Sequence, residues 1–310
     1  MDGLGDPLGD CVRCGTIGAP WRRWPISSAM QRIFVGDVQG CADELDQILA
    51  RAQRRYGSEV EIWFVGDLVN RGPHDLRVLE AVRERVEAGQ AQSIVGNHEL
   101  AMLRLSFGLR EVGPLDTVHR LLARPDGAEW VAWIRSRPVV LTGQLGGRPF
   151  AMLHGASAPD WSLAELSRRA AAISEWLGAT EESRAHRFLA GEAGPDEARD
   201  DLARITTCRS VDEAGWSPRV PEEGGRGARP WHEAWAARGH SHGLVYGHWA
   251  MQGLHLAPSL RGLDTACVHH GHCEQGLLTA WLPDESAADP FALPDEGFWQ
   301  VPAARRYYRI

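Results

Sequence analysis

The chain has 310 residues, of which 44% are hydrophobic and 24% are charged, a composition typical of a globular protein with a sizeable core. Its net charge of -8 argues against bulk, non-specific binding of DNA or RNA, which requires a basic surface. All 33 basic residues are arginine, which excludes a P-loop lysine, a Schiff base and a Ser-Lys dyad.

The two ends of the chain differ in composition from its middle. Residues 1–20 are acidic and rich in Gly and Pro, so we expect a disordered leader over residues 1–30, ahead of a single domain spanning residues 31–310. The leader lacks a basic region followed by an apolar stretch, and no apolar run reaches the ~20 residues of a membrane helix. Only Cys11 and Cys14 form a CxxC pair, a weak metal signal. Scattered cysteines without a signal peptide indicate a cytoplasmic protein.

From residue 32, short apolar runs alternate with segments of helical periodicity. Strands are expected at residues 32–35, 61–65 and 93–95, and helices at residues 41–55, 76–87 and 99–108. This βαβαβα order indicates a mostly parallel sheet with helices packed on it.

The second half of the chain follows another pattern. Helices are expected at residues 116–135 and 162–190, a hairpin at residues 138–154 around Gly146-Gly147, and late strands within residues 244–250 and 277–282. Residues 191–230 are polar and rich in Gly, Pro and acidic residues. This composition indicates a mobile cap or lid and not a part of the core. A cap insertion is therefore predicted over about residues 160–240. The tail from residue 283 is expected to wrap the surface.

Five apolar runs end directly in polar residues. They are followed by Gly36-Asp37, Gly66-Asp67, Gly96-Asn97-His98-Glu99, His154-Gly155 and Gly247-His248. One Gly-Asp alone is more often a turn, but ligands bind at the carboxyl ends of strands in open α/β sheets. Five such ends together therefore predict a metal site. Its oxygen and nitrogen donors suit Mn²⁺, Fe or Zn²⁺.

These motifs resemble a known family. "GDVQG" (36–40), "GDLVNRGP" (66–73), "GNHE" (96–99), "LHG" (153–155) and "YGHW" (246–249) are similar to the calcineurin-like metallophosphoesterases of the phosphoprotein-phosphatase type. "GDLVNRGP", "GHWA" and "LDTAC" (263–267) are most similar to the branch of symmetrical diadenosine tetraphosphatases. The resemblance runs from about residue 32 to residue 281. It implies an α/β sandwich of two mixed β-sheets flanked by helices, with a helical and loop cap insertion.

The resemblance also implies roles for the polar residues at the strand ends. Asp37 would ligate a first metal ion, Asp67 would bridge both ions, and a second ion would be held by Asn97, His154 and His248. His98 would be the general acid and Arg71 would clamp phosphate bidentately, as lysine does not. With the bridging Asp67, they form the expected catalytic set.

The implied reaction is symmetrical hydrolysis of diadenosine tetraphosphate to two ADP. The cofactors would be two divalent ions, with Mn²⁺ favoured over Co, Mg or Fe. RNA ends capped by dinucleoside polyphosphates are a further expected substrate, because the cleaved bond is the same. No membrane or bulk DNA partner is expected, and the oligomeric state is left open.

Two positions depart from the family pattern. Family members often carry His as a metal ligand where this chain has Gln39, and an amide oxygen there should favour Mn²⁺ or Mg²⁺ over Zn²⁺. A hydrogen bond from Gln39 to a backbone turn is an equal alternative. Related protein phosphatases carry Asp where this chain has Asn70, which cannot stabilise an imidazolium by charge. Asn70 therefore favours the nucleotide branch.

The expected substrate contacts rest on weaker signals. Besides Arg71 and Asn70 they are Arg204, Arg209, Trp249 and Asp264. For the two other arginines, a solvated helix or loop face is an equal alternative. Trp249 could stack on adenine or belong to the core.

Other histidine clusters compete for a metal role. "GHSH" (239–242) follows a segment that is not a strand and ranks below His248, and "HHGHC" (269–273) is more often a polar loop. Two rival functions stay open: a Ser/Thr or Tyr protein phosphatase of the same family, and a non-catalytic nucleotide sensor that lost one metal at Gln39.

Overall fold

Alternate residues of the first strands enter two different hydrophobic clusters, as expected from the two-residue period of a strand. In β1 (Gln31–Val35), Ile33 and Val35 join the cluster that contains the helices, whereas Phe34 faces the other way. β2 (Val60–Phe64) repeats this pattern with Trp63. Both faces of this sheet are therefore buried, which explains the continuous apolar runs in the sequence.

The computed structural model describes residues 30–272 and 275–308. The predicted leader, the Cys11–Cys14 pair and Cys273 lie outside these residues. The chain from Gln31 to Ile310 forms one compact unit.

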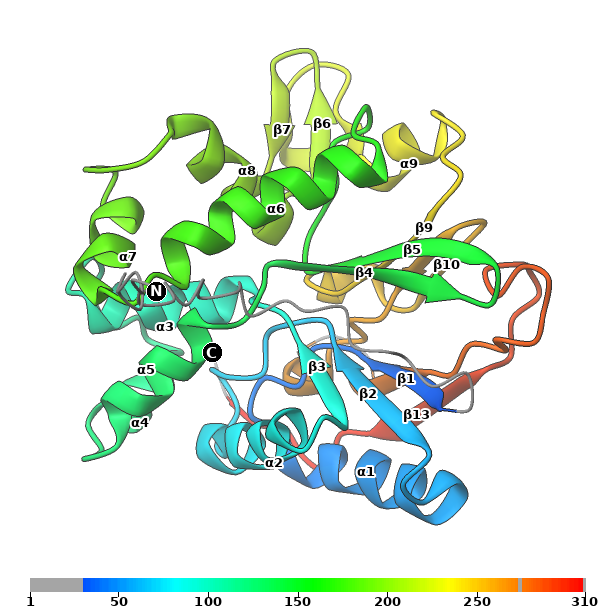
Figure 1. Cartoon of the computed structure of the whole chain (residues 1–310), viewed down its shortest axis with the longest axis horizontal. Coiled ribbons are helices and arrows are strands. Elements are labelled where there is room, and N and C mark those ends of the chain that lie inside the picture. The colour runs from blue at the N-terminus through cyan, green and yellow to red at the C-terminus, as the bar shows by residue number, and fades with distance from the viewer. Residues whose placement is uncertain (1–29, 273–274, 309–310) are drawn as a thin grey trace, which may run out of the picture. The chain divides into compact units, whose positions relative to one another are not determined.

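Two five-stranded mixed sheets carry the unit (Figure 1). The first has the order β13-β12-β1-β2-β3. In it, β1, β2 and β3 are parallel, β12 pairs antiparallel with β1, and β13 pairs antiparallel with β12. The second has the order β10-β11-β9-β5-β4. The other strands are β3 (Ala91–Ser93), β4 (Val140–Leu145), β5 (Arg148–Leu153), β9 (Gly243–Tyr246), β10 (His255–Ala257), β11 (Leu260–Gly262), β12 (Leu277–Trp281) and β13 (Phe298–Pro302).

An aromatic layer joins the two sheets face to face. The ring of Phe34 on β1 meets Phe150 on β5 edge-on, with centroids 5.4 Å apart, and Trp63 on β2 lies 5.5 Å from the same ring. Trp281 on β12 packs 5.3 Å from Phe34. This packing confirms the predicted two-sheet sandwich and brings the carboxyl ends of β1, β2, β5 and β9 to a common rim.

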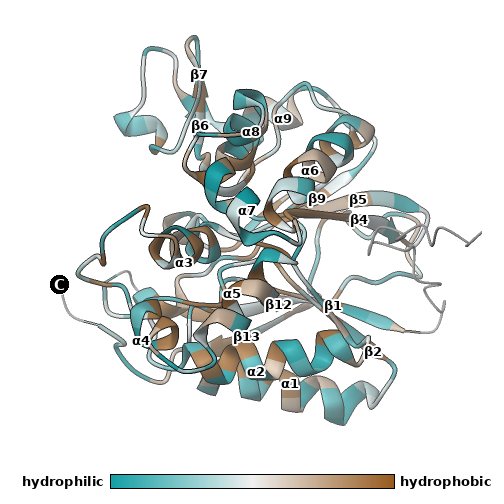
Figure 2. Cartoon of the chain, turned by 60° about the vertical axis from the view of Figure 1, so that its left-hand side comes forward, coloured by the Kyte–Doolittle hydropathy of each residue, from teal (hydrophilic) through white to brown (hydrophobic). Residues whose placement is uncertain are grey.

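Helices cover the outer faces of both sheets. The structure has α1 (Ala42–Tyr56), α2 (Asp75–Glu87), α3 (Asn97–Ser106), α4 (Val118–Leu122), α5 (Gly127–Arg135), α6 (Leu163–Leu177), α7 (Glu182–Leu189), α8 (Asp196–Thr207) and α9 (Trp231–Ala236). Helix α1 buries Leu45, Ile48, Leu49 and Ala52, which lie on one helical face. Figure 2 shows hydrophobic and hydrophilic residues sharing the circumference of α1 and α2.

The predicted strands and helices of the first half are confirmed within one or two residues. The predicted helix over residues 116–135 is two helices, because Pro125 in the break cannot continue α4. The predicted helix over residues 162–190 is also two, separated after Gly178.

The predicted cap contains more regular structure than its composition suggested. Helix α8 buries Ala198, Leu202 and Ile205 in the main hydrophobic cluster. A small sheet follows, with β6 (Ser210–Asp212), β7 (Gly215–Ser217) and β8 (Arg229–Pro230). Within residues 191–230, the expectation of a segment apart from the core is therefore wrong for α8, because α8 is amphipathic and its apolar face is packed.

The C-terminal tail also differs from its prediction. Its segment β13 pairs antiparallel with β12 at the edge of the first sheet and buries Trp299 and Val301. The alternation in "FWQVP" is the strand signal behind this pairing. Within the part of the chain that is described, no helix combines the length and the hydropathy needed to cross a bilayer.

Candidate metal centre

Three electron-pair donors converge where β3, β5 and β9 end. His154 Nδ1 lies 2.9 Å from the Val65 carbonyl, so this nitrogen donates and Nε2 faces Asn97 Oδ1 at 3.0 Å. His248 Nε2 lies 3.0 Å from the Thr207 carbonyl, which leaves Nδ1 facing the same Asn97 oxygen at 2.7 Å. Backbone carbonyls thus set both tautomers and aim the two ring nitrogens at one point, as in metal-binding histidines.

Three carboxylates gather on the other side of this point. Asp67 Oδ1 lies 3.3 Å from His154 Nε2, and Asp37, Asp67 and His154 each offer an atom within 4.8 Å of the others. Asp264 lies against Asp37, close enough for a hydrogen bond between the two carboxyl groups. All three carboxylates are buried, with at most 4% of each residue exposed.

Glycines let the backbone come close to these carboxylates. A Cβ atom at Gly96 would lie 2.2 Å from Asp67 Oδ1, and one at Gly247 would lie 2.0 Å from Asp37 Oδ1. Both contacts are far shorter than van der Waals separation. Glycine is therefore required at both positions, for close approach.

The electrostatics of the carboxylates fit a cation. Burial raises the pKa of Asp37 well above its usual range, and the neighbouring Asp264 and Asp67 raise it further. Burial and Asp67 raise the pKa of Asp264 to about 6. Burial would also raise the pKa of Asp67, but His154 and His98 lower it below its usual range. A divalent cation among these groups would relieve the repulsion between the carboxylates.

The histidines support the same conclusion. Burial lowers the pKa of His248 well below its usual range, with Arg209 and His154 adding to the effect, so the imidazole is a neutral ligand. Burial also acts to lower the pKa of His154, but Asp67 and the Val65 carbonyl raise it overall. The raised pKa means that the surrounding oxygen atoms favour a positive charge at His154 Nε2. A metal ion can supply that charge in place of a proton.

Gln39 and His98 lie together beside Asp67. The Gln39 amide nitrogen, Nε2, donates a hydrogen bond to Asp67 Oδ2 at 3.3 Å and lies 3.5 Å from His98 Nε2. Its side chain therefore faces the cluster instead of bonding to a backbone turn. The backbone N–H of His98 donates to Asp67 Oδ1 at 2.8 Å, while its Nδ1 is buried without a partner. Burial lowers the pKa of His98.

Arg71 offers a cation at the same edge. It follows Asn70 in a loop where both residues have positive φ, and its backbone N–H donates to the Asn70 side-chain oxygen at 3.0 Å. Arg71 lies close enough to His98 to lower the pKa of that imidazole, after the larger effect of burial. Among the residues that the structure describes, no carboxylate forms an ion pair with Arg71. Its guanidinium is therefore available to an anionic ligand.

Glu99 positions this loop and was not singled out by the sequence interpretation. Its two carboxylate oxygens accept hydrogen bonds from the backbone N–H groups of Asp67, Leu68 and Gly96 at 2.8 Å each, and from Val69 at 3.3 Å. The available signal was its position three residues after Gly96 at the start of α3, where an acidic residue reaches back to the helix start.

Asn70 does not present its side chain as expected. Its side-chain oxygen accepts from the backbone N–H groups of Arg71 and Thr117, and its Nδ2 donates to Asp116 at 2.9 Å. Asn70 is 3% exposed, so the amide organises the loop and is not open to a substrate. Asp264, which was expected to contact the substrate, is the third carboxylate of the cluster.

The two candidate arginines of the cap lie in different surroundings. Arg209 lies near Asp264, Asp67 and Asp37, whose charges oppose the lowering of its pKa by burial. Arg204 instead pairs with Asp200 at 3.4 Å and lies over the ring of Trp161, 5.0 Å from its centroid, so these cap residues hold its guanidinium. Trp249 is partly buried and packs against the main hydrophobic cluster.

The histidines of the two competing clusters also lie in different surroundings. His240 Nε2 bonds to the Pro159 carbonyl and its ring stacks on Trp235, away from the carboxylates. His269 of "HHGHC" is hydrogen-bonded through Nδ1 to the Tyr308 hydroxyl, and burial lowers its pKa to about 4, with Arg71 and His98 adding to the effect. A polar loop was expected there, and His269 belongs to its partly buried part.

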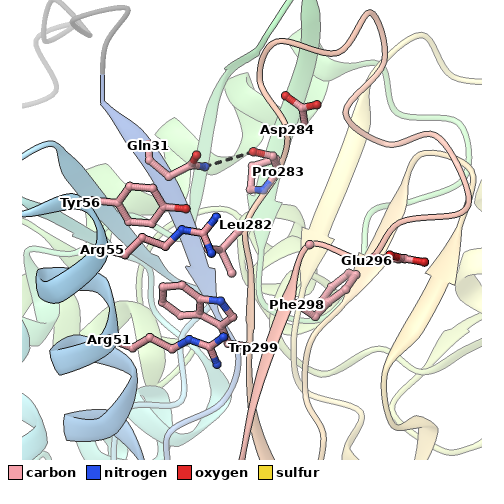
Figure 3. Close-up of a pocket in the computed structure, with 11 residues that line it drawn as sticks. Gln31, Arg51, Arg55, Tyr56, Leu282, Pro283, Asp284, Glu296, Phe298 and Trp299 are labelled. Atoms are coloured by element: carbon pink, nitrogen blue, oxygen red, sulfur yellow. Dashed lines mark hydrogen bonds between the residues drawn. The ribbon is translucent and has the colours of Figure 1, made fainter.

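A separate pocket of about 430 Å³ lies elsewhere (Figure 3). It is lined by Gln31, at the start of β1, and by Arg51, Arg55 and Trp299. Asp37 follows the opposite end of β1, so this pocket is not part of the strand-end cluster.

Comparison with known proteins supports the assignment of these residues to a phosphoesterase fold. The family profile described as calcineurin-like phosphoesterase matches residues 30–272. Two relatives, from Shewanella sp. (strain ANA-3) and Tolumonas auensis, carry the name symmetrical bis(5'-nucleosyl)-tetraphosphatase. They are 33% and 30% identical over 268 and 272 residues, which cover 81% and 83% of this chain and 94% and 95% of theirs.

A solved structure described as a putative diadenosine tetraphosphatase has the same fold. Its TM-score is 0.56 at 23% identity, over 89% of this chain and 95% of that one. The chain therefore belongs to the calcineurin-like phosphoesterases, and it is a metal-binding hydrolase.

Proposed function

We propose that this protein uses a dinuclear metal centre to hydrolyse diadenosine tetraphosphate symmetrically to two ADP. The observation that carries the proposal is the position of Asp67. One of its oxygens faces His154, beside Asn97 and His248, and the other faces Gln39. The Asp67 carboxylate thus lies between two groups of side chains, a position that suits a bridging ligand.

The proposed ligands divide into two sets. Asp37, Gln39 and Asp67 would hold the first ion, and Asp67, Asn97, His154 and His248 the second. Asp264 would add negative charge beside Asp37. The oxygen-rich first set favours Mn²⁺ or Mg²⁺ over Zn²⁺. Two ions there would supply Lewis-acid stabilisation of the attacking and leaving oxygens in an in-line displacement.

The neighbouring side chains would bind and protonate the substrate. Arg71, with no carboxylate partner in the described structure, would grip a phosphate through two N–H groups. His98 would protonate the leaving phosphate oxygen. Burial lowers its pKa in the free protein, and the negative charge of a bound polyphosphate would raise that pKa again. Arg209 would contact a second phosphate from the cap side.

The choice of substrate rests on the relatives. Both carry a name that specifies symmetrical cleavage of bis(5'-nucleosyl) tetraphosphates. The lack of an aspartate at Asn70 and the buried state of its amide do not favour a protein phosphatase. Dinucleoside-polyphosphate caps on RNA present the same bond and are a second proposed substrate.

The test is a product analysis with diadenosine tetraphosphate and Mn²⁺, resolved by chromatography. ADP as the sole product would support symmetrical cleavage. ATP plus AMP would overturn it, and turnover of phosphopeptides alone would favour a protein phosphatase. Binding without turnover, with fewer than two metal ions per chain, would favour a sensor.

Matched variants connect the result to the site. His98→Asn should lower kcat by about 10²–10⁴-fold, the usual contribution of a general acid. His186→Asn, in α7 outside the cluster, should change kcat little. Equal losses in both variants would contradict the role of His98.

A further inference from the structure

A second group of metal-binding side chains lies in the core, apart from the strand-end cluster. Cys41, Glu44 and Cys267 are all buried, and one ligand atom of each lies within 4.8 Å of the others. None of them belongs to the proposed catalytic set. The exposed fractions are 0% for Cys41 and Glu44 and 2% for Cys267.

Local structure explains why these three meet. Cys41 precedes the first residue of α1, and Glu44 lies three residues further, on the same side of that helix. Cys267 begins a short 3-10 helix directly after Ala266, whose left-handed φ of 61° turns the chain inward. The fold therefore brings together Cys41 and Cys267, which are 226 positions apart in the sequence.

Glu44 is an unusual core residue. Its carboxylate accepts a hydrogen bond from the Ala304 N–H at 2.6 Å and from the Tyr307 hydroxyl, which lies 2.6 Å from both oxygens. In the described part of the chain, no Arg or His forms an ion pair with it. A buried carboxylate is costly without a positive charge nearby, and the two adjacent sulfur atoms are soft ligands for a metal ion.

We propose that Cys41, Glu44 and Cys267 form a structural site for a zinc-class divalent ion, separate from the catalytic centre. Two thiolates and one carboxylate are ligands that Zn²⁺ accepts. Binding would release two protons, one from each thiol, and the ion would offset the charge of Glu44. The Tyr307 hydroxyl would orient the carboxylate from outside the ligand set.

Such a site would join three segments. It would hold the start of α1 next to Gln39, the turn that follows Asp264, and the C-terminal segment that contains Tyr307. The site would therefore support two loops of the strand-end cluster without touching substrate. This role does not depend on which substrate the enzyme hydrolyses.

The test uses cobalt as a probe of thiolate ligation. The full chain is prepared with Cys11, Cys14 and Cys273 changed to serine, so that Cys41, Cys208 and Cys267 are the remaining thiols. Reduced, metal-free protein is then titrated with Co²⁺ without oxygen. The proposed catalytic ligands contain no sulfur, so a thiolate-to-cobalt charge-transfer band reports only the new site, whatever the hydrolysis assay shows.

The expected result is a charge-transfer band whose limiting intensity corresponds to one thiolate-bound Co²⁺ per chain. Cys208→Ser should keep the band, because Cys208 is a buried thiol outside the trio, with its sulfur directed to the Ser210 carbonyl. Cys267→Ser should abolish it, and Glu44→Gln should weaken Co²⁺ binding. No band in the parent chain, or a band lost equally with Cys208→Ser, would overturn the proposal.

A second measurement needs no core variant. X-ray absorption on the Zn²⁺-loaded parent chain should show two sulfur atoms at ~2.3 Å from zinc in one class of site. A shell of only nitrogen and oxygen, or a disulfide between Cys41 and Cys267 in freshly purified protein, would overturn the proposal.

Discussion

The two sides of the strand-end cluster are built from opposite kinds of donor. On one side the donors are the Asn97 amide and the imidazoles of His154 and His248, and backbone carbonyls hold both imidazoles in place. On the other side, burial and the neighbouring carboxylates raise the pKa values of Asp37 and Asp264, which makes both groups costly to ionise. The histidine side is arranged before any ion binds, whereas the carboxylate side gains most from binding one. Metal affinity thus has two sources: the fixed geometry of the histidine side and the negative charge of the carboxylate side.

Asp67 is shared by both sides, so its loss should have the largest effect. Asp67→Asn should lower kcat/KM for diadenosine tetraphosphate by ~10³-fold or more, since several kcal/mol of charge stabilisation depend on the ions. Steady-state kinetics with saturating Mn²⁺ measure this. Asp160→Asn, at an exposed position, is the matched control. A loss below about tenfold would mean that the two sides do not share a ligand.

Glu99→Gln tests whether the hydrogen bonds that Glu99 accepts from the Asp67 loop and from Gly96 hold the metal ligands in position. The amide would direct N–H groups at backbone N–H groups that now bond to the carboxylate, leaving buried donors unpaired. We expect ~10–100-fold weaker metal binding, the usual effect of losing an outer-shell partner. Calorimetric titration with Mn²⁺ checks this. Unchanged affinity would show that Asp67 holds its position without Glu99.

Asp264→Asn sharpens the comparison through pH. The pKa of Asp264 rises from 3.8 to about 6 on folding, because of burial and the nearby Asp67. In the metal-free protein, Asp264 therefore lowers the free energy of unfolding as the pH rises from about 4 through 6, because the buried carboxyl group is costly to ionise. The variant removes this penalty, so metal-free Asp264→Asn should be more stable at pH 7 by about 2–3 kcal/mol.

Urea unfolding of chelated protein at pH 5, 6 and 7 measures the effect of Asp264→Asn. The gap between variant and wild type should widen with pH and shrink when Mn²⁺ is added, since the variant binds the ion less tightly. A gap that does not change with pH would show that repulsion on the carboxylate side is unimportant.

Gln39→His should have the smallest effect. It places an imidazole on the carboxylate side, where the amide now contacts Asp67 and His98. We expect the preference for Zn²⁺ over Mn²⁺ to rise by about tenfold, with kcat changed only a few-fold. Competition between the two ions, followed by metal analysis, gives the ratio. A large gain of activity would instead indicate that Gln39 impairs the wild-type site.

The sequence by itself determined the rim of the site. Five residues follow an apolar run, either directly or after one glycine: Asp37, Asp67, Asn97, His154 and His248. The carboxyl ends of parallel strands lie at one edge of a sheet. These are local signals combined with one topological rule, so they needed no knowledge of side-chain contacts. The same reasoning predicted the first three strands and the two helices between them, because period and length distinguish these elements.

Only the tertiary structure decided what surrounds that rim. Glu99 holds the Asp67 loop, Asp264 joins the carboxylates and Arg209 reaches the site from the cap, while the Asn70 amide is used inside its own loop. The burial of α8 and the pairing of β13 were missed for the same reason. Each depends on a partner distant in the sequence, and residue type and spacing carry no information about such a partner.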